Sequence, residues 1–175
     1  MTDLLIVVDM QRDFVSGALG SEQARAIVPA VAARIQQAKA ENTQVVFTLD
    51  THFENYLDTE EGRYLPIPHC IEGTEGRTLY GQTASARRPL DRCILKSTFP
   101  ALELGTWLKG KDYDEVELWG VVSYQCVLAN AVMVKAALPE AEVVVDAKCV
   151  AGPDPALHQK ALDVMEALHI TVRNR

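Results

Sequence analysis

Cys126 stands where a strand-like segment gives way to an apolar helical one, in the stretch GVVSYQCVLANAV. A helix N-terminus carries partial positive charge and free N–H groups, which favour a thiolate and lower the pKa of a cysteine. The same N–H groups can bind an oxyanion during acyl transfer. The pattern therefore predicts a nucleophilic cysteine, and the alternative is a buried cysteine that starts a core helix.

Asp9 and Lys96 each end an apolar run, LLIVV and CILK respectively. A buried carboxylate is costly unless it is paired, and one held beside a thiol can act as general base and then as general acid. A lysine in the same cleft would keep Asp9 ionised and stabilise developing negative charge. The alternatives are a turn cap for Asp9 and a surface position for Lys96. We expect Asp13 to be a structural cap, paired with Arg12 or a backbone amide.

Asp50 and His52 form an Asp-x-His pair, and alternate residues of an extended segment point the same way. His69 lies further along, after the rigid Leu-Pro-Ile-Pro segment at 65–68. One carboxylate and two imidazoles suit a divalent metal with open positions. Three glutamates between them could supply a further oxygen: Glu54, Glu60 and Glu61. The alternative is a polar loop with incidental histidines; His158 and His169 are expected at a helix surface or a helix end.

The elements that would position these groups alternate along the chain. Strand-like apolar runs are followed by helical patterns, which indicates β-α-β units and a parallel sheet. The predicted strands are Leu4–Val8, Gln44–Leu49, Cys93–Lys96, Glu115–Gly120, Glu142–Val145 and, more weakly, Ile170–Arg173. The predicted helices are Ser21–Ala40 with Ser21 as N-cap, Ala101–Lys109, Cys126–Leu138 and Asp154–His169 with Asp154 as N-cap.

This order predicts a single domain, 1–175, with a three-layer α/β/α architecture around a mostly parallel six-stranded sheet, a Rossmann-like arrangement. Active residues in such folds lie at the carboxyl ends of the strands. That edge would receive Asp9, Asp50, His52, Lys96 and the segment Ser123–Cys126. The long segment Asp50–Ala86 lacks clear periodicity but contains aromatic and apolar residues, so we expect an ordered flap over this edge.

Composition narrows the class of protein. The 175 residues carry 24 acidic and 17 basic side chains, a net charge of −7, which disfavours binding to nucleic acid. No apolar run is long enough for a membrane span and the start lacks a signal-peptide pattern, so we expect no membrane partner and a cytoplasmic location. The four cysteines form no C-x-x-C pair, and we expect free thiols.

These motifs, taken in order, resemble those of the isochorismatase-like cysteine hydrolases. The resemblance rests on VVDMQRDF around Asp9, ILKSTF around Lys96 and GVVSYQCV around Cys126, and it covers nearly the whole chain. The Asp-x-His pair and the stretch PIPHCIEGTEG around His69 are similar to the nicotinamidase branch.

The resemblance implies roles for particular residues. Asp9 would be the general acid and base and Cys126 the nucleophile, with Lys96 completing the triad. Phe14 would pack on the substrate ring. A cis peptide at Val122–Ser123 would turn a backbone N–H, that of Val122, toward the oxyanion beside the N–H of Cys126. The implied metal ligands are Asp50, His52 and His69, with Glu61 added in some members.

The implied reaction is hydrolysis of a linear amide through a cysteine thioester, most directly of nicotinamide to nicotinate and ammonia. The implied cofactor is a divalent ion, zinc first and manganese or iron as alternatives, and the implied assembly is a homodimer or homotetramer. Tyr124 departs from the family pattern, which has an acidic residue there, and so does Pro100. Other readings are an amidase for a carbamoyl, ureido or maleamate-type substrate, or a non-catalytic binding domain.

Overall fold

The computed structural model describes residues 3–175 and contains a six-stranded sheet in the order β3-β2-β1-β4-β5-β6, with every pairing parallel. The prediction of an α/β fold around a mostly parallel six-stranded sheet is therefore confirmed. The strands are β1 Asp3–Val8, β2 Gln44–Asp50, β3 Arg92–Lys96, β4 Glu115–Val121, β5 Glu142–Ala151 and β6 Thr171–Arg173.

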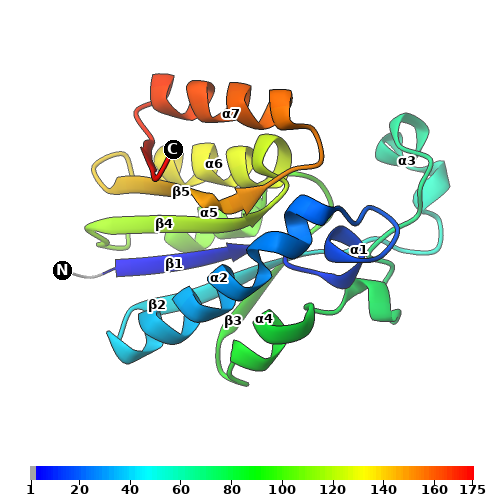
Figure 1. Cartoon of the computed structure of the whole chain (residues 1–175), viewed down its shortest axis with the longest axis horizontal. Helices are drawn as coiled ribbons and strands as arrows, with labels where there is room; N and C mark the ends of the chain where they lie inside the picture. The colour runs from blue at the N-terminus through cyan, green and yellow to red at the C-terminus, as the bar shows by residue number, and fades with distance from the viewer. Residues whose placement is uncertain (1–2) are drawn as a thin grey trace.

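The helices cover both faces of this sheet (Figure 1). They are α1 Arg12–Val15, α2 Glu22–Ala40, α3 Glu60–Tyr64, α4 Gly81–Ala86, α5 Leu102–Leu108, α6 Leu128–Ala137 and α7 Pro155–Ala167. Ser21 and Asp154 cap α2 and α7 as predicted, each accepting from backbone N–H groups of the first turn. Of the described residues, no helix is both long and apolar enough to cross a membrane.

Alternation along β1 divides the core into two layers. Leu4, Ile6 and Val8 pack on one side with residues of α5, α6 and α7, whereas Leu5 and Val7 pack on the other side with residues of α2. Period-two alternation of a strand buried on both faces produces this division, because successive side chains point to opposite faces. β1 is thus fixed from both sides, and so is the position at which it ends.

β1 and β4 approach each other closely at Gly120. A side chain there would place its Cβ 2.1 Å from the carbonyl oxygen of Val8, and the φ of +136° is one that other residues rarely adopt. Val8 pairs with both Thr48 of β2 and Gly120 of β4, so the chain leaves β1 for Asp9 between two neighbouring strands.

Two predicted elements differ in extent. β5 continues to Ala151, six residues beyond the predicted Val145, because the register slips between Leu118 and Gly120 of β4 and pairing then resumes at Val150. The predicted flap is ordered and includes α3, which stands beyond the carboxyl ends of the strands, but α4 packs against α2 instead (Figure 1).

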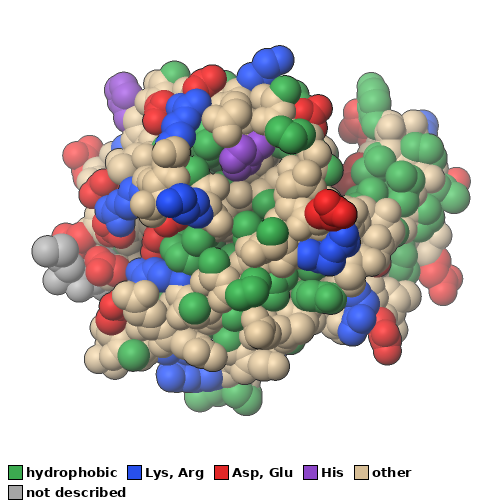
Figure 2. Space-filling model, viewed as in Figure 1, with side chains coloured by type: hydrophobic (Ala, Val, Ile, Leu, Met, Phe, Trp, Pro, Cys, Tyr) green, Lys and Arg blue, Asp and Glu red, His purple; other side chains and the backbone are tan. Residues whose placement is uncertain are grey.

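The surface is mixed in charge. On the face shown in Figure 2, Lys and Arg side chains alternate with Asp and Glu, and hydrophobic side chains gather over the lobe that contains α3. Leu57 and Tyr64 of this lobe are 53% and 86% exposed.

Candidate active site

The carboxyl ends of neighbouring strands bring four of the predicted groups together. Lys96 is the register partner of Asp50 on β3 and β2, and Asp9 follows β1 directly. The ammonium of Lys96 lies 2.7 Å from Oδ2 of Asp9, 3.4 Å from Sγ of Cys126 and 3.2 Å from Oδ1 of Asp50. All four side chains are buried. The acid, the amine and the thiol therefore meet at one edge of the sheet.

Asp9 is oriented by its neighbours. The Thr48 hydroxyl donates to Oδ1 of Asp9 at 2.6 Å, and Asp9 has a φ of +48°, a conformation that aspartate tolerates better than most residues. Burial raises the pKa of Asp9 above its ordinary value, against the opposing charge of Lys96. Although burial opposes its charge, Asp9 and Cys126 raise the pKa of Lys96, so the lysine is an ammonium.

Cys126 lies in a π-helical turn, Ser123–Val127, between β4 and α6. The carbonyl of Val122 accepts from the N–H groups of Gln125 and Val127, on either side of Cys126. The predicted fall in the pKa of Cys126 is wrong. Burial and the nearby Asp9 carboxylate raise the pKa of the thiol well above its ordinary value, outweighing the Lys96 ammonium. The resting cysteine is thus a thiol that needs a base.

The cis peptide joins Val121 to Val122, one residue before the predicted Val122–Ser123 bond. The prediction was wrong by one position because β4 remains in the sheet as far as Val121, which pairs with Ala151. The cis peptide therefore follows directly after the last residue of β4 that pairs with β5. Ser123 is fully buried at the start of the π-helical turn.

Next to these residues lies a group of side chains of the types that ligate metal ions. Single ligand atoms of Asp50, His52, Glu61 and His69 all lie within 4.8 Å of one another. Oδ2 of Asp50 is 3.0 Å from Nε2 of His52 and 3.3 Å from Nε2 of His69, and Oε1 of Glu61 is 3.5 and 3.6 Å from the same two atoms. Two imidazoles and two carboxylates fit a divalent ion such as zinc.

Partners behind these ligands fix their orientation. Nδ1 of His69 lies 2.8 Å from the carbonyl of Ile67, so this nitrogen carries the proton and Nε2 is free to ligate. The Gln11 amide holds the Asp50 backbone on both sides, donating to its carbonyl and accepting from its N–H. Although burial opposes it, the neighbouring His52, His69 and Lys96 side chains keep the pKa of Asp50 below its ordinary value.

The remaining predicted residues lie around this centre. The ring of Phe14 lies 5.4 Å from that of His69. Pro100 lines a surface cavity together with Lys96 and Thr98. Asp13 lies within α1 and is not its cap; its carboxylate accepts from the backbone N–H of Cys70 at 2.8 Å, which ties α1 to the segment around His69.

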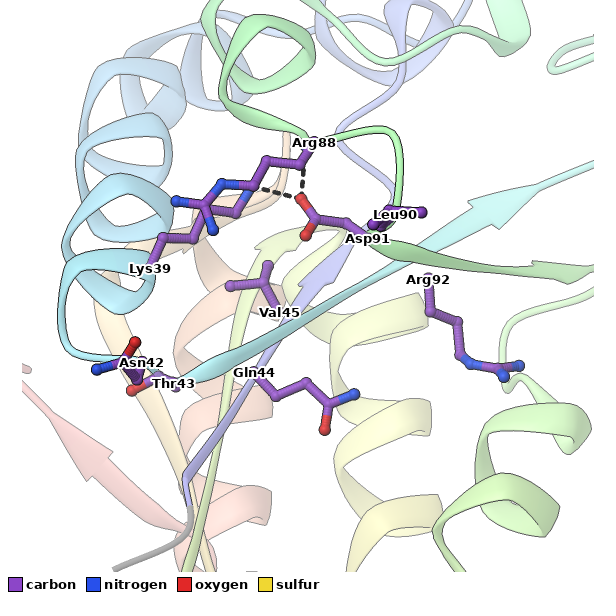
Figure 3. A pocket seen from close by; sticks show the side chains of 9 residues that line it. All are labelled: Lys39, Asn42, Thr43, Gln44, Val45, Arg88, Leu90, Asp91 and Arg92. Carbon is purple, nitrogen blue, oxygen red and sulfur yellow. Dashed lines mark hydrogen bonds and ion pairs between the residues drawn. The ribbon is translucent and has the colours of Figure 1, made fainter.

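Cavities lie beside the site, between the segment that contains α3 and the loop after β3. Two cavities of about 320 and 450 Å³ border it, and Glu60, Glu61 and Thr98 line both. The first reaches His52 and the second reaches Gln125, next to the nucleophile. Another cavity, of about 470 Å³, lies at the opposite edge of the sheet, where Lys39 and the N–H of Arg88 bind the Asp91 carboxylate (Figure 3). It contains none of the predicted site residues.

Four residues that support the site were not predicted to do so from the sequence: Gln11, Thr48, Asn130 and His158. Thr48 could have been found from the pairing of β1 with β2, which puts it beside Val8. Asn130 donates to the carbonyls of Phe99 and Cys126 and accepts from the N–H of Ala101. His158, expected at a helix surface, is half-buried, and its Nδ1 lies 2.9 Å from the Ser123 hydroxyl.

Comparison with known proteins decides the family. Residues 3–174 match the family model described as an isochorismatase domain. The chain belongs to the isochorismatase family. The prediction that this protein is an enzyme that hydrolyses carbon–nitrogen bonds is confirmed by its family and by its nicotinamidase/pyrazinamidase relatives.

Individual relatives agree with this assignment. An isochorismatase family protein of Bacillus subtilis is 32% identical over 143 residues, 75% of this chain and 78% of its own length. The crystal structure of a nicotinamidase/pyrazinamidase from Bacillus subtilis has a TM-score of 0.87 at 28% identity, covering 98% of this chain and 99% of the other. A pyrazinamidase of Pyrococcus horikoshii, crystallised with zinc, has a TM-score of 0.82 at 31% identity and covers 98% of both chains.

Proposed function

We propose that this protein is a nicotinamidase that hydrolyses nicotinamide to nicotinate and ammonia through a thioester on Cys126. The observation that carries the proposal is the single ammonium of Lys96, which touches Asp9, Cys126 and Asp50. It joins a nucleophile and its base to a group of metal ligands. The similarity to a nicotinamidase/pyrazinamidase and to a zinc-bound pyrazinamidase supports the same conclusion.

The first step is attack by sulfur on the amide. Asp9 accepts the thiol proton of Cys126, whose raised pKa makes a neighbouring base necessary. The thiolate adds to the carboxamide carbon, and the oxyanion is bound by the backbone N–H groups of Val122 and Cys126. Lys96 remains protonated and compensates the negative charge that builds up beside Asp9.

The second step releases ammonia and restores the cysteine. Asp9 returns its proton to the departing nitrogen, the carbon–nitrogen bond breaks and a thioester remains. Asp9 then accepts a proton from water as its oxygen attacks the thioester, and nicotinate leaves as the thiol is reformed. A raised pKa suits Asp9 to this double role, because the carboxyl must carry a proton for part of each cycle.

Asp50, His52, Glu61 and His69 would hold a divalent ion, which supplies a Lewis-acid position for the ring nitrogen of nicotinamide when bound. Phe14, packed against His69, offers an aromatic surface for the same ring. The protein thus binds the ring at one end of the site and cleaves the carboxamide at the other.

Ammonia release from nicotinamide, measured with and without a chelator, tests the proposal. We expect release by the wild-type protein, a decrease on chelation, and loss of more than about 99% of turnover in Cys126→Ala. Cys149→Ala is the matched control, since Cys149 is also free and buried but lies in β5. Turnover of another amide without any release from nicotinamide would overturn the assignment of the substrate, and an active Cys126→Ala variant would overturn the covalent route.

A further inference from the structure

His158 contacts the π-helical turn from outside the catalytic group. Its Nδ1 lies 2.9 Å from the hydroxyl of Ser123, three residues before Cys126. Ser123 is fully buried, and a buried hydroxyl without a partner destabilises the conformation that buries it. The His158 ring therefore satisfies a polar group at the point where β4 passes into the turn.

The backbone that carries His158 is held firmly. It lies in the first turn of α7, where its N–H donates to the carbonyl of Asp154. The Asp154 carboxylate caps the same turn through the N–H groups of Ala156 and Leu157, and Pro155 occupies the first helical position. The imidazole is thus presented by a fixed helix end.

The Ser123–His158 hydrogen bond forms with an uncharged imidazole ring. Burial and the positive charge of Arg175 lower the pKa of His158 below its ordinary value, so the ring is neutral near neutral pH. A neutral imidazole has one acceptor nitrogen, and Ser123 has a hydroxyl proton to donate. The hydrogen bond therefore joins two neutral groups: the hydroxyl donates when Nδ1 is the acceptor nitrogen, and Nδ1–H donates to the hydroxyl oxygen in the other tautomer.

Close packing leaves the turn little room beside this hydrogen bond. At Gly152 a Cβ would lie 2.5 Å from the ring of Tyr124 and 3.1 Å from the hydroxyl of Ser123. The end of β5 thus lies directly against the first two residues of the turn. Tyr124, the departure from the family pattern, fills this contact, and the Ser123–His158 hydrogen bond fixes the turn from the side of α7.

We propose that His158 is a positioning residue, which holds Ser123 and through it the turn that presents the Cys126 thiol and the neighbouring backbone N–H groups. It touches neither the thiol nor Asp9. This inference rests on the proposed function, since it assigns His158 a part in the same reaction. Its effect falls on the chemical step, because a displaced turn moves the nucleophile relative to Asp9 and Lys96 while the ring-binding residues stay in place.

Substitutions that differ in one hydrogen bond test this role. His158→Leu removes the hydrogen-bonding nitrogen and retains apolar volume, whereas His158→Asn places an amide group, which can accept or donate, near the position of Nδ1. We expect kcat to fall about 10- to 100-fold in His158→Leu, with KM changed less than about threefold, and to recover to within about fivefold of wild type in His158→Asn. Gln159→Ala, the next and exposed residue of α7, should match wild type.

Chemical rescue adds a readout that a merely structural role would not give. His158 lines a cavity of about 270 Å³ between α2, β5 and α7, so added imidazole can reach the space left in His158→Ala. We expect imidazole to raise kcat of this variant at least about threefold and to leave wild type unchanged. Equal kcat in His158→Leu and wild type, or equal losses in the Leu and Asn variants together with no rescue, would overturn the proposal.

A result in which wild type fails to release ammonia from nicotinamide tells against the proposed function alone. The reaction of Cys126 with iodoacetamide, followed by peptide mass analysis, then tests the positioning role without any substrate. We expect its rate to change at least about threefold in His158→Leu and to remain within about 1.5-fold in His158→Asn. Identical rates in all three proteins would overturn the inference.

Discussion

Lys96 and Asp50 join the two halves of the site. The lysine ammonium that pairs with Asp9 lies 3.2 Å from Oδ1 of Asp50, while Oδ2 of the same carboxylate faces both imidazoles of the metal-ligating group. The two residues are register partners on adjacent parallel strands, so the backbone itself sets this relationship. One carboxylate thus contacts the Lys96 ammonium on one side and the proposed metal ligands His52 and His69 on the other.

Asp50→Asn should therefore impair both halves. The amide retains the shape but removes a negative charge from Lys96 and a ligand oxygen from the metal group. We expect metal affinity to fall at least about tenfold, and kcat to remain at least about tenfold below wild type when metal is saturating. Metal titration followed by steady-state kinetics at each concentration measures both effects.

His52→Asn separates the two roles. His52 belongs to the metal group, whereas the Lys96 ammonium contacts Asp9, Asp50, Thr98 and Cys126. At saturating metal its kcat should return closer to wild type than that of Asp50→Asn. The same kcat in both variants would contradict a link through Lys96.

The acidic limb of the pH profile of kcat/KM should follow the protonation of Asp9. The carboxylate form is the base, so kcat/KM falls as the pH drops through the pKa of Asp9, which burial has raised above its ordinary value. Removing a hydrogen bond to the charged form raises this pKa further. Thr48→Val, which deletes the 2.6 Å donor to Oδ1, should therefore move the acidic limb upward by about one pH unit.

Thr43→Val is a suitable control for that shift. Thr43 lies just before β2, at the opposite end of the strand from Asp9, so its loss should leave the limb in place. An acidic limb that stays fixed in Thr48→Val would show that a group other than Asp9 controls it.

Most of the predicted site residues were identified because they lie at the carboxyl ends of predicted strands. Asp9, Asp50 and Lys96 were found because parallel strands deliver their carboxyl ends to one edge, and this depends only on the order of the elements. Cys126 was found by the same argument, yet the direction of its pKa shift was wrong. A helix start is visible in sequence, whereas the depth at which the thiol is buried beside Asp9 is set by tertiary packing.

His158 shows the limit of the same approach. It lies 35 residues from Ser123 in sequence, and their contact depends on how α7 packs against the π-helical turn. Nothing in the pattern of α7 distinguishes it from an ordinary helix-surface histidine. The position of the cis peptide was missed by one residue for a related reason, since the end of the β4 ladder depends on its pairing with Ala151.

Metal removal should be visible in stability as well as in activity. A ligand that binds only the folded state stabilises it in proportion to the logarithm of its concentration over its Kd. We expect added zinc to raise the Tm of metal-free protein and a chelator to reverse the effect. Glu61→Gln, which keeps the size of the side chain but removes its charge, should need about 10- to 100-fold more zinc for the same rise.

Glu54→Gln gives the matched control for that titration. Glu54 is an exposed glutamate of the same segment and lies outside the metal-ligating group. Its Tm response to zinc should match wild type. An unchanged Tm response in Glu61→Gln would show that Glu61 is not a ligand. No Tm response to zinc in wild type would show that the group does not bind zinc.

Asn130 should make a large contribution to stability from a single buried amide. It accepts from the N–H of Ala101 at 2.9 Å and donates to the carbonyls of Phe99 and Cys126 at 3.1 and 2.8 Å, joining α6 to the loop after β3. Asn130→Ala leaves these groups without their partner inside the protein. We expect a loss of about 2–4 kcal/mol in the free energy of unfolding, measured by denaturant titration.

Asn130→Asp distinguishes the hydrogen bonds from the volume of the side chain. It retains the acceptor for Ala101 but sets a second oxygen against two carbonyls, so it should be destabilised although its size is unchanged. Asn55→Ala, at an exposed position, should stay within about 0.5 kcal/mol of wild type. Wild-type stability in Asn130→Asp would mean that the donors of Asn130 contribute nothing, and that the carbonyl of Cys126 is held by the helix alone.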